Sequence, residues 1–118
     1  MPAPDDLQEL ELVRKAIDLV EVSGCLEWDE KEEKRLRARP PIANLYPDEV
    51  TELPVQFVRN GGTIFQKKET RKEWQHRRNY WYKVNIPYQG LLKGLFVEFY
   101  LFDEDPDYPS VSLVNYHQ

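Results

Sequence analysis

The sequence is dominated by one apolar run, Leu95-Phe96-Val97-Glu98-Phe99-Tyr100-Leu101-Phe102, in which Glu98 is the only charged residue. Side chains of a strand alternate between two faces, so this run is apolar on both faces. It must therefore lie inside a sheet that is covered, wholly or partly, on each side. On either side of it along the chain, Tyr80–Ile86 and Ser110–Tyr116 alternate like strands. Thr63–Thr70 is typical of an edge strand, because its two lysines discourage further pairing.

These four segments predict an antiparallel meander. Short connections join the last three, and strands that follow one another in this way usually pair as neighbours. Within the last segment, strict alternation places Val111 and Leu113 on one face and Val114 and Tyr116 on the other.

The N-terminal third has helical periodicity. Apolar side chains recur at helical spacing and form one stripe: Leu7, Leu10, Val13, Ile17 and Val20. Ser23-Gly24 is expected to end this helix. A second helix should begin after Asp29, whose carboxylate can cap it. It lies in the charged segment 27–41, where Leu36 is the only apolar anchor. We therefore expect that segment to fray or face solvent.

The stretch 46–62 admits two interpretations. Pro47 at a first helical position, with acidic residues after it, favours a helix that Pro54 would kink. The alternative makes Val55–Arg59 a strand that turns at Asn60-Gly61 into the next segment. We favour the kinked helix.

Taken together, the patterns predict one α+β domain over residues 1–118. Two or three N-terminal helices should pack on one face of a C-terminal antiparallel meander of about four strands, because their apolar stripe has no other surface to cover.

Composition narrows the class of protein. The chain has 118 residues, a length typical of one domain, and a net charge of −5. A single cysteine, Cys25, excludes an intramolecular disulfide and favours a reducing compartment. The N-terminus lacks the features of a secretory signal, and no apolar run approaches the length of a membrane span. We expect a cytoplasmic protein with no membrane partner and no cofactor.

Positive charge is concentrated in residues 67–83, which hold seven Lys and Arg against two Glu, so that the strip carries +5 and the rest of the chain −10. Such a strip can steer an anionic partner, or it can pair with the protein's own acidic residues. Guanidinium groups hold phosphates and aromatic rings stack on unpaired bases. The residues that this strip offers to a protein or RNA partner are Arg71, Trp74, His76, Arg77, Arg78 and Trp81.

Other candidate sites have simpler interpretations. Asp103, Asp105 and Asp107 alternate like the opening of a calcium loop, but Tyr108 stands where that loop needs glycine, which favours a plain hairpin turn. Cys25 is interpreted as a small buried residue rather than a nucleophile.

The C-terminal half resembles the RelE/ParE-like superfamily of bacterial toxins. The resemblance rests on Trp81-Tyr82-Lys83-Val84, Leu95–Asp103 and Val111–His117, which match an aromatic-basic strand, an apolar strand with an acidic end, and a closing strand that ends near His or Tyr. In ribonuclease members, basic residues on the sheet bind RNA and a terminal His or Tyr assists cleavage. The resemblance therefore implies catalytic roles for Arg71, Arg78, Lys83, Tyr116 and His117.

From the residues alone, no combination of nucleophile, base and orienting group is visible. We therefore expect a non-enzymatic, regulatory module that binds another protein, with a homodimer as a further option. The alternative is an RNA-binding domain or toxin-like ribonuclease that uses the basic strip 67–83.

Overall fold

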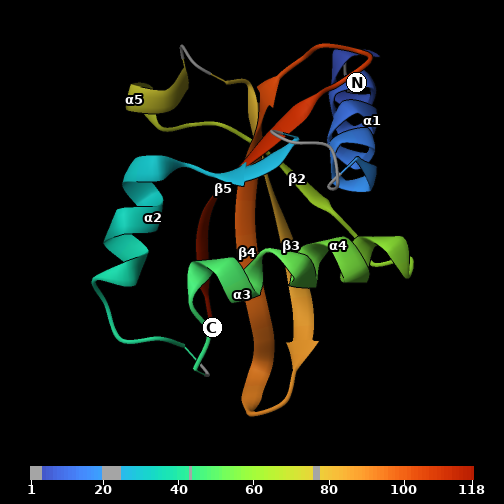
Figure 1. Ribbon diagram of the computed structural model, residues 1–118. Coiled ribbons are helices and arrows are strands. Elements are labelled where there is room, and N and C mark those ends of the chain that lie inside the picture. Colours follow the sequence, from blue (N-terminus) through green and yellow to red (C-terminus); the bar gives the residue numbers. More distant parts are fainter. Residues whose placement is uncertain (1–3, 20–24, 43, 76–77) are drawn as a thin grey trace.

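The computed structural model describes residues 4–19, 25–42, 44–75 and 78–118, and within them a five-stranded mixed sheet forms the centre of the protein (Figure 1). The strand order is β1-β5-β4-β3-β2. The strands are β1 (Leu26–Trp28), β2 (Phe65–Lys68), β3 (Tyr80–Tyr88), β4 (Leu91–Asp103) and β5 (Ser110–His117). The helices are α1 (Pro4–Asp18), α2 (Glu30–Arg37), α3 (Pro47–Val50), α4 (Glu52–Arg59) and α5 (Lys72–Gln75).

The α+β class is confirmed, but the expectation of a purely antiparallel four-stranded meander is wrong. Strands β2 to β5 pair antiparallel, and β1 adds a fifth strand that runs parallel to β5, with Leu26 opposite Val111. A three-residue strand is too short to show alternation, and β1 lies directly before a highly charged helix. Hydrogen bonds from the Val111 amide to the Cys25 carbonyl and from the Asp29 amide to the Leu113 carbonyl extend the pairing at both ends.

Strand β4 separates two unlike sides of the sheet. Its inward side chains, Leu95, Val97, Phe99 and Leu101, are buried in the core. Helices α3 and α4 cross this side of the sheet, and α1 lies beside them (Figure 1). The alternate side chains of β4 are only partly covered, and Phe102 is 70% exposed. The apolar run is thus fully covered on one face and partly on the other.

A β-bulge in β5 changes the predicted facing of its last residues. Glu98 pairs with Asn115 and the next residue, Phe99, pairs with Leu113, so that Val114 has no partner in the register. The extra residue shifts the alternation by one position. Tyr116 therefore lies on the same buried face as Leu113, and the prediction that they face opposite sides is wrong.

The helices follow the predicted local chemistry with adjustments. In α1, Val13 and Ile17 are buried as expected, whereas Leu7 is exposed. The expected end of that helix at Ser23-Gly24 and its apolar Val20 lie outside the described residues. The Asp29 cap of α2 is confirmed, because its Oδ1 accepts a hydrogen bond from the Glu32 amide at 3.1 Å.

The stretch 46–62 forms a broken helix, as favoured, and the hairpin alternative is wrong. The break falls at Thr51, between α3 and α4, rather than at Pro54. Pro54 becomes the third residue of α4, a position whose amide would have no partner within the helix. The proline therefore costs no helical hydrogen bond there. None of the helices in the described ranges has the length and apolarity needed to cross a bilayer.

The two faces of β4 predict unequal sensitivity to truncation. Phe99 is 1% exposed, so Phe99→Ala should cost about 3–5 kcal/mol of unfolding free energy through lost burial and a cavity. Phe102, three residues along the same strand, is the matched control, and Phe102→Ala should stay within about 0.5 kcal/mol. Urea unfolding of both variants measures the difference. Equal costs would contradict the assignment of the core face.

Candidate functional site

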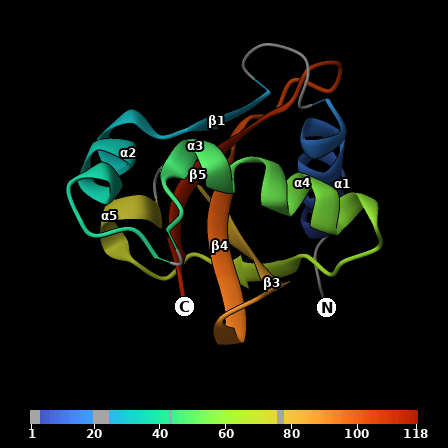
Figure 2. The same cartoon turned by 60° about the horizontal axis from the view of Figure 1, so that its bottom comes forward.

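The side of the sheet that faces away from α3 and α4 is called the open face below. The cross-strand register places these side chains on it: Phe65 and Lys67 from β2; Trp81, Lys83 and Asn85 from β3; Phe96, Glu98, Tyr100 and Phe102 from β4; Ser112, Asn115 and His117 from β5. Aromatic rings, cations and the polar side chains of β4 and β5 thus share one surface. Helices α2 and α5 lie together at one side of the sheet (Figures 1 and 2).

His117 and Glu98 form a hydrogen-bonded pair on this face. Nε2 of His117 lies 2.9 Å from Oε2 of Glu98, and the same oxygen accepts a hydrogen bond from Nδ2 of Asn115 at 3.3 Å. The imidazole also stacks on the ring of Phe96, with centroids 5.3 Å apart and planes within 13°. The carboxylate and the ring therefore fix the orientation of the imidazole, whose side chain remains 43% exposed. This is the arrangement of a base and its orienting group.

Two cations flank the His117–Glu98 pair. Lys83 is directly opposite Glu98 in the β3–β4 register, and its Nζ lies 5.5 Å from the centroid of the Phe96 ring. The Arg71 guanidinium lies 6.0 Å from the centroid of Trp81. Its hydrogen bonds with Glu69 are the main cause that raises the pKa of Arg71, and attraction to Glu98 adds to it. The pair is thus bordered by positive charge on the β3 side.

Glu69 is a buried carboxylate that holds two arginines. Its side chain is 1% exposed, and Oε1 accepts from Arg78 Nε at 2.8 Å and from Arg71 Nη2 at 3.1 Å. Oε2 accepts from Arg71 Nε at 3.0 Å. Burial alone would raise the pKa of Glu69, but the hydrogen bonds from Arg71 and Arg78 outweigh it and lower the pKa from 4.5 to about 2. Glu69 is therefore ionised wherever the protein is folded near neutral pH.

Arg78 lies between two aromatic rings. Its guanidinium carbon is 4.8 Å from the Trp74 centroid and 4.4 Å from the Tyr100 centroid, and its side chain is 4% exposed. Nη1 of Arg78 is buried and has no hydrogen-bond partner in the described part of the chain. A buried guanidinium N–H without an acceptor is costly, so this atom is a donor in need of one.

A small pocket opens beside this arginine. Its volume is about 120 Å³, and its walls include Arg71, Trp74, Arg78, Glu98, Tyr100 and Asn115. Because Glu98 lines the pocket and also contacts His117, the pocket adjoins the hydrogen-bonded pair.

The residues predicted from sequence divide into three groups. Arg71, Arg78, Lys83 and His117 lie on or beside the open face, and so do Trp74 and Trp81. Tyr116 does not: it is buried on the helix side, where its hydroxyl donates to the Leu45 carbonyl at 2.7 Å. His76 and Arg77 lie outside the described residues.

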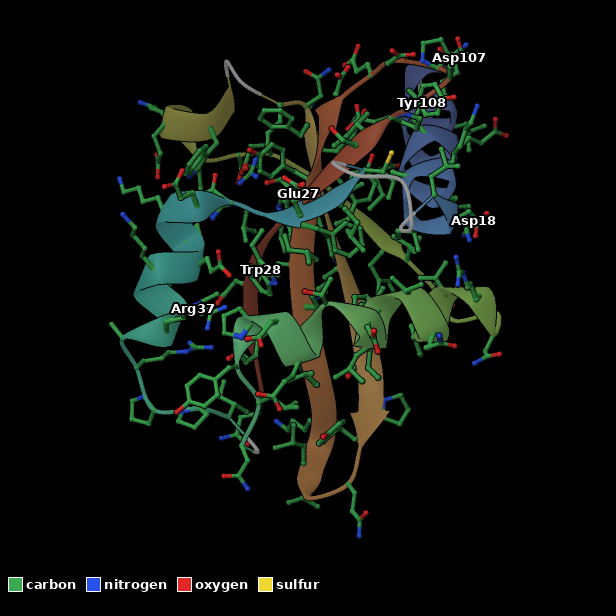
Figure 3. The ribbon with its side chains drawn as sticks, viewed as in Figure 1. Asp18, Glu27, Trp28, Arg37, Asp107 and Tyr108 are labelled. Atoms are coloured by element: carbon green, nitrogen blue, oxygen red, sulfur yellow. The ribbon has the colours of Figure 1, made fainter. Side chains whose placement is uncertain are left out.

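The acidic turn uses its carboxylates locally. Oδ1 of Asp103 accepts from the Asp105 amide, and Oδ1 of Asp105 accepts from the Asp107 amide, at 3.0 and 2.9 Å. Figure 3 shows Asp107 and Tyr108 beside α1, and Lys15 of that helix donates to the Pro106 carbonyl of the same turn. Among the described residues, no group of three His, Cys, Asp or Glu side chains is placed to hold a metal ion.

Two acidic residues of the site were missed from sequence. Each carried a signal, because Glu98 is the only charge in an apolar strand and Glu69 is an acid inside a basic strip. A carboxylate in such surroundings needs a cationic or hydrogen-bonding partner.

Comparisons with protein-family models, with curated proteins and with solved structures each found no match. The resemblance to RelE/ParE-like toxins therefore stays a prediction.

The depressed pKa of Glu69 predicts a loss of stability in acid. The ionised carboxylate stabilises the fold above its ordinary pKa of 4.5, and this contribution disappears as pH falls from there towards 2. The shift corresponds to roughly 3 kcal/mol at about 1.4 kcal/mol per pKa unit. Denaturant unfolding at a series of pH values measures this slope.

Glu69→Gln should remove that part of the slope and cost about 3–5 kcal/mol at neutral pH, because Arg78 keeps its charge in a buried position. Glu73→Gln, an exposed glutamate of α5, is the matched control and should behave like the parent protein. If the unfolding free energy of Glu69→Gln depended on acidic pH as steeply as that of the parent protein, the assigned role of Glu69 in holding Arg71 and Arg78 would be contradicted.

Proposed function

We propose that the protein binds single-stranded RNA on the open face and cleaves it by attack of a ribose 2′-hydroxyl on the adjacent phosphate. The observation that carries this proposal is the 2.9 Å contact of His117 with Glu98 on an accessible sheet surface, bordered by Lys83 and Arg71. An oriented base beside cations is what this reaction requires. Four of the five residues implied by the toxin-like resemblance lie on or beside this surface.

The ring nitrogens of His117 have different environments. Because the Glu98 carboxylate can only accept, Nε2 carries the hydrogen between them, and in a neutral imidazole Nδ1 is then the basic nitrogen. Nδ1 lies 3.3 Å from the Gln118 carbonyl oxygen, which can accept a hydrogen bond once Nδ1 is protonated. Both contacts therefore hold the imidazole in one orientation.

The chemical step then balances with no reagent other than water. The 2′-oxygen bonds to phosphorus as its proton passes to Nδ1 of His117, and the bond from phosphorus to the 5′-oxygen breaks. Because the attacking and departing oxygens lie on opposite sides of phosphorus, a water molecule protonates the departing 5′-oxygen and the imidazolium later returns its proton to solvent. The products are a 2′,3′-cyclic phosphate and a 5′-hydroxyl end. Lys83 and Arg71 offset the charge that builds on the phosphate oxygens.

Aromatic side chains supply the contacts for bases. Phe65 is exposed at the edge of the open face, and Trp81 and Phe96 are partly exposed next to cations. Unpaired bases stack on such rings while cations follow the backbone. This composition favours single strands over duplexes.

Cleavage of a fluorophore-labelled single-stranded RNA tests the proposal. His117→Ala should lower the rate by about 10²- to 10⁴-fold, the usual contribution of a general base. Glu98→Gln should also lower it, because the carboxylate that accepts from Nε2 and orients the imidazole is lost. The same oligonucleotide with 2′-deoxy or 2′-O-methyl riboses should not be cut, and the product should carry a cyclic phosphate.

Lys83→Ala and Lys93→Ala form a matched pair of charge deletions. Lys93 is exposed near the β3–β4 turn, away from His117, so its loss should change neither cleavage nor binding. Lys83→Ala should weaken RNA binding. It should also lower the slope of log affinity against log salt concentration by about one, because one phosphate contact fewer releases about one counterion fewer. Cleavage that survives His117→Ala would refute the assigned base.

The expectation of a protein-binding module stays a prediction. The same RNA assays distinguish it from the ribonuclease proposal. The exposed rings of Phe102 and Tyr108 line one groove with Glu27 and are the surface that favours it. If the protein neither cleaves nor retains RNA at low salt, the ribonuclease proposal fails and a protein partner becomes the better hypothesis.

A further inference from the structure

The pocket beside Arg78 has features that RNA cleavage alone does not require. Its volume of about 120 Å³ is far below the size of pockets for drug-sized ligands, which begin at about 300 Å³. Trp74 and Tyr100 line it, and their rings also enclose the Arg78 guanidinium. A small group with an aromatic ring therefore suits such a space better than a bulky ligand.

We propose that this pocket receives a single nucleobase of the RNA and selects guanine. The inference rests on the proposed function, because it concerns the substrate of the same open face. The pocket adjoins the His117–Glu98 pair through Glu98, so a base inside it leaves its own ribose and phosphate near His117.

The hydrogen-bond donors and acceptors that line the pocket determine which base it binds. Arg78 brings the buried Nη1 that has no partner in the described part of the chain, and Arg71 brings a second guanidinium. Guanine offers O6 and N7 as adjacent acceptors, and an arginine contact to this pair is the commonest specific contact to any base. The Arg71 side chain, which is 48% exposed, is the guanidinium that such a base can reach, and Arg78 adds positive charge behind it.

The pocket lining also holds carboxylates. Asp29 and Glu32, from the start of α2, line the pocket together with Glu98. Asp29 uses Oδ1 to cap α2, and Glu32 uses Oε2 to pair with Arg35, so each is held in place by one oxygen. Guanine carries two adjacent N–H donors on its Watson–Crick edge, which a carboxylate can accept together. Arginines and carboxylates in one lining therefore match guanine better than the other bases.

Calorimetric titration with the four nucleoside 3′-monophosphates tests the pocket independently of cleavage. Guanosine 3′-monophosphate should bind at least about tenfold more tightly than the adenosine, cytidine and uridine compounds. Inosine 3′-monophosphate, which lacks the exocyclic amino group, should fall between them.

Val114 lines the pocket without joining the charged network, so Val114→Phe should fill the space and abolish the guanosine preference. Val114→Ala leaves the pocket open and is the matched control that should keep it. Circular dichroism spectra of both variants show whether the fold is retained.

The outcomes separate the pocket from the reaction. If RNA is cleaved but the four nucleotides bind alike, or none binds, the guanine pocket is refuted and the proposed function stands. If guanosine 3′-monophosphate binds selectively while RNA is not cleaved, the pocket stands and the catalytic role of His117 fails. If Val114→Phe still prefers guanosine 3′-monophosphate, guanine binds outside this pocket and the inference is overturned.

Discussion

A desolvated carboxylate organises the open face. Glu69 is almost fully removed from water, and a buried anion of this kind is stable only when several donors surround it. Arg71 and Arg78 supply those donors, which draws residues on both sides of α5 towards the end of β2. The ion pairs hold Arg78 between Trp74 and Tyr100 and leave Arg71 beside Trp81. Without Glu69, both guanidinium groups would lose these ion pairs and keep their contacts with aromatic rings.

Strand β4 connects this polar arrangement to the rigid part of the protein. Phe99 is fixed in the core, and its neighbour Glu98 is held by the same backbone on the opposite side. A site built on paired strands is positioned more precisely than one on loops. His117 and Lys83 belong to the two strands that flank β4, so the three groups share one sheet. Helices α3 and α4 thus contribute to the site indirectly, because they cover the opposite face of β4, whereas α2 and α5 supply Glu32 and Trp74 to the pocket directly.

Much of the fold was accessible from sequence because hydrophobic periodicity reports burial directly. The alternation of β3, β4 and β5, the Asp29 cap and the broken helix at 46–62 are all local features. Strand β1 was missed because its three residues depend on a distant partner, β5. The bulge at Val114 was missed because alternation assumes an unbroken register.

The residues of the site also fall into those that the sequence could suggest and those that it could not. Arg71, Lys83 and His117 were nominated through the toxin-like resemblance, whereas Glu69 and Glu98 were overlooked. Their importance depends on which side chains the sheet brings near them, and that information is in the pairing of strands rather than in local sequence.

The unpaired Val114 gives the C-terminal end of β5 a tolerance to shortening that an unbroken strand does not have. Residues after it owe their sidedness to that one additional position. Removal of Val114 would place Asn115 directly after Leu113 and close the ladder without a bulge, with Tyr116 still inward and His117 still outward. Loss of one residue from a regular stretch of a strand would instead exchange its two faces. The bulge is therefore a point at which the strand can lose a residue without turning its end over.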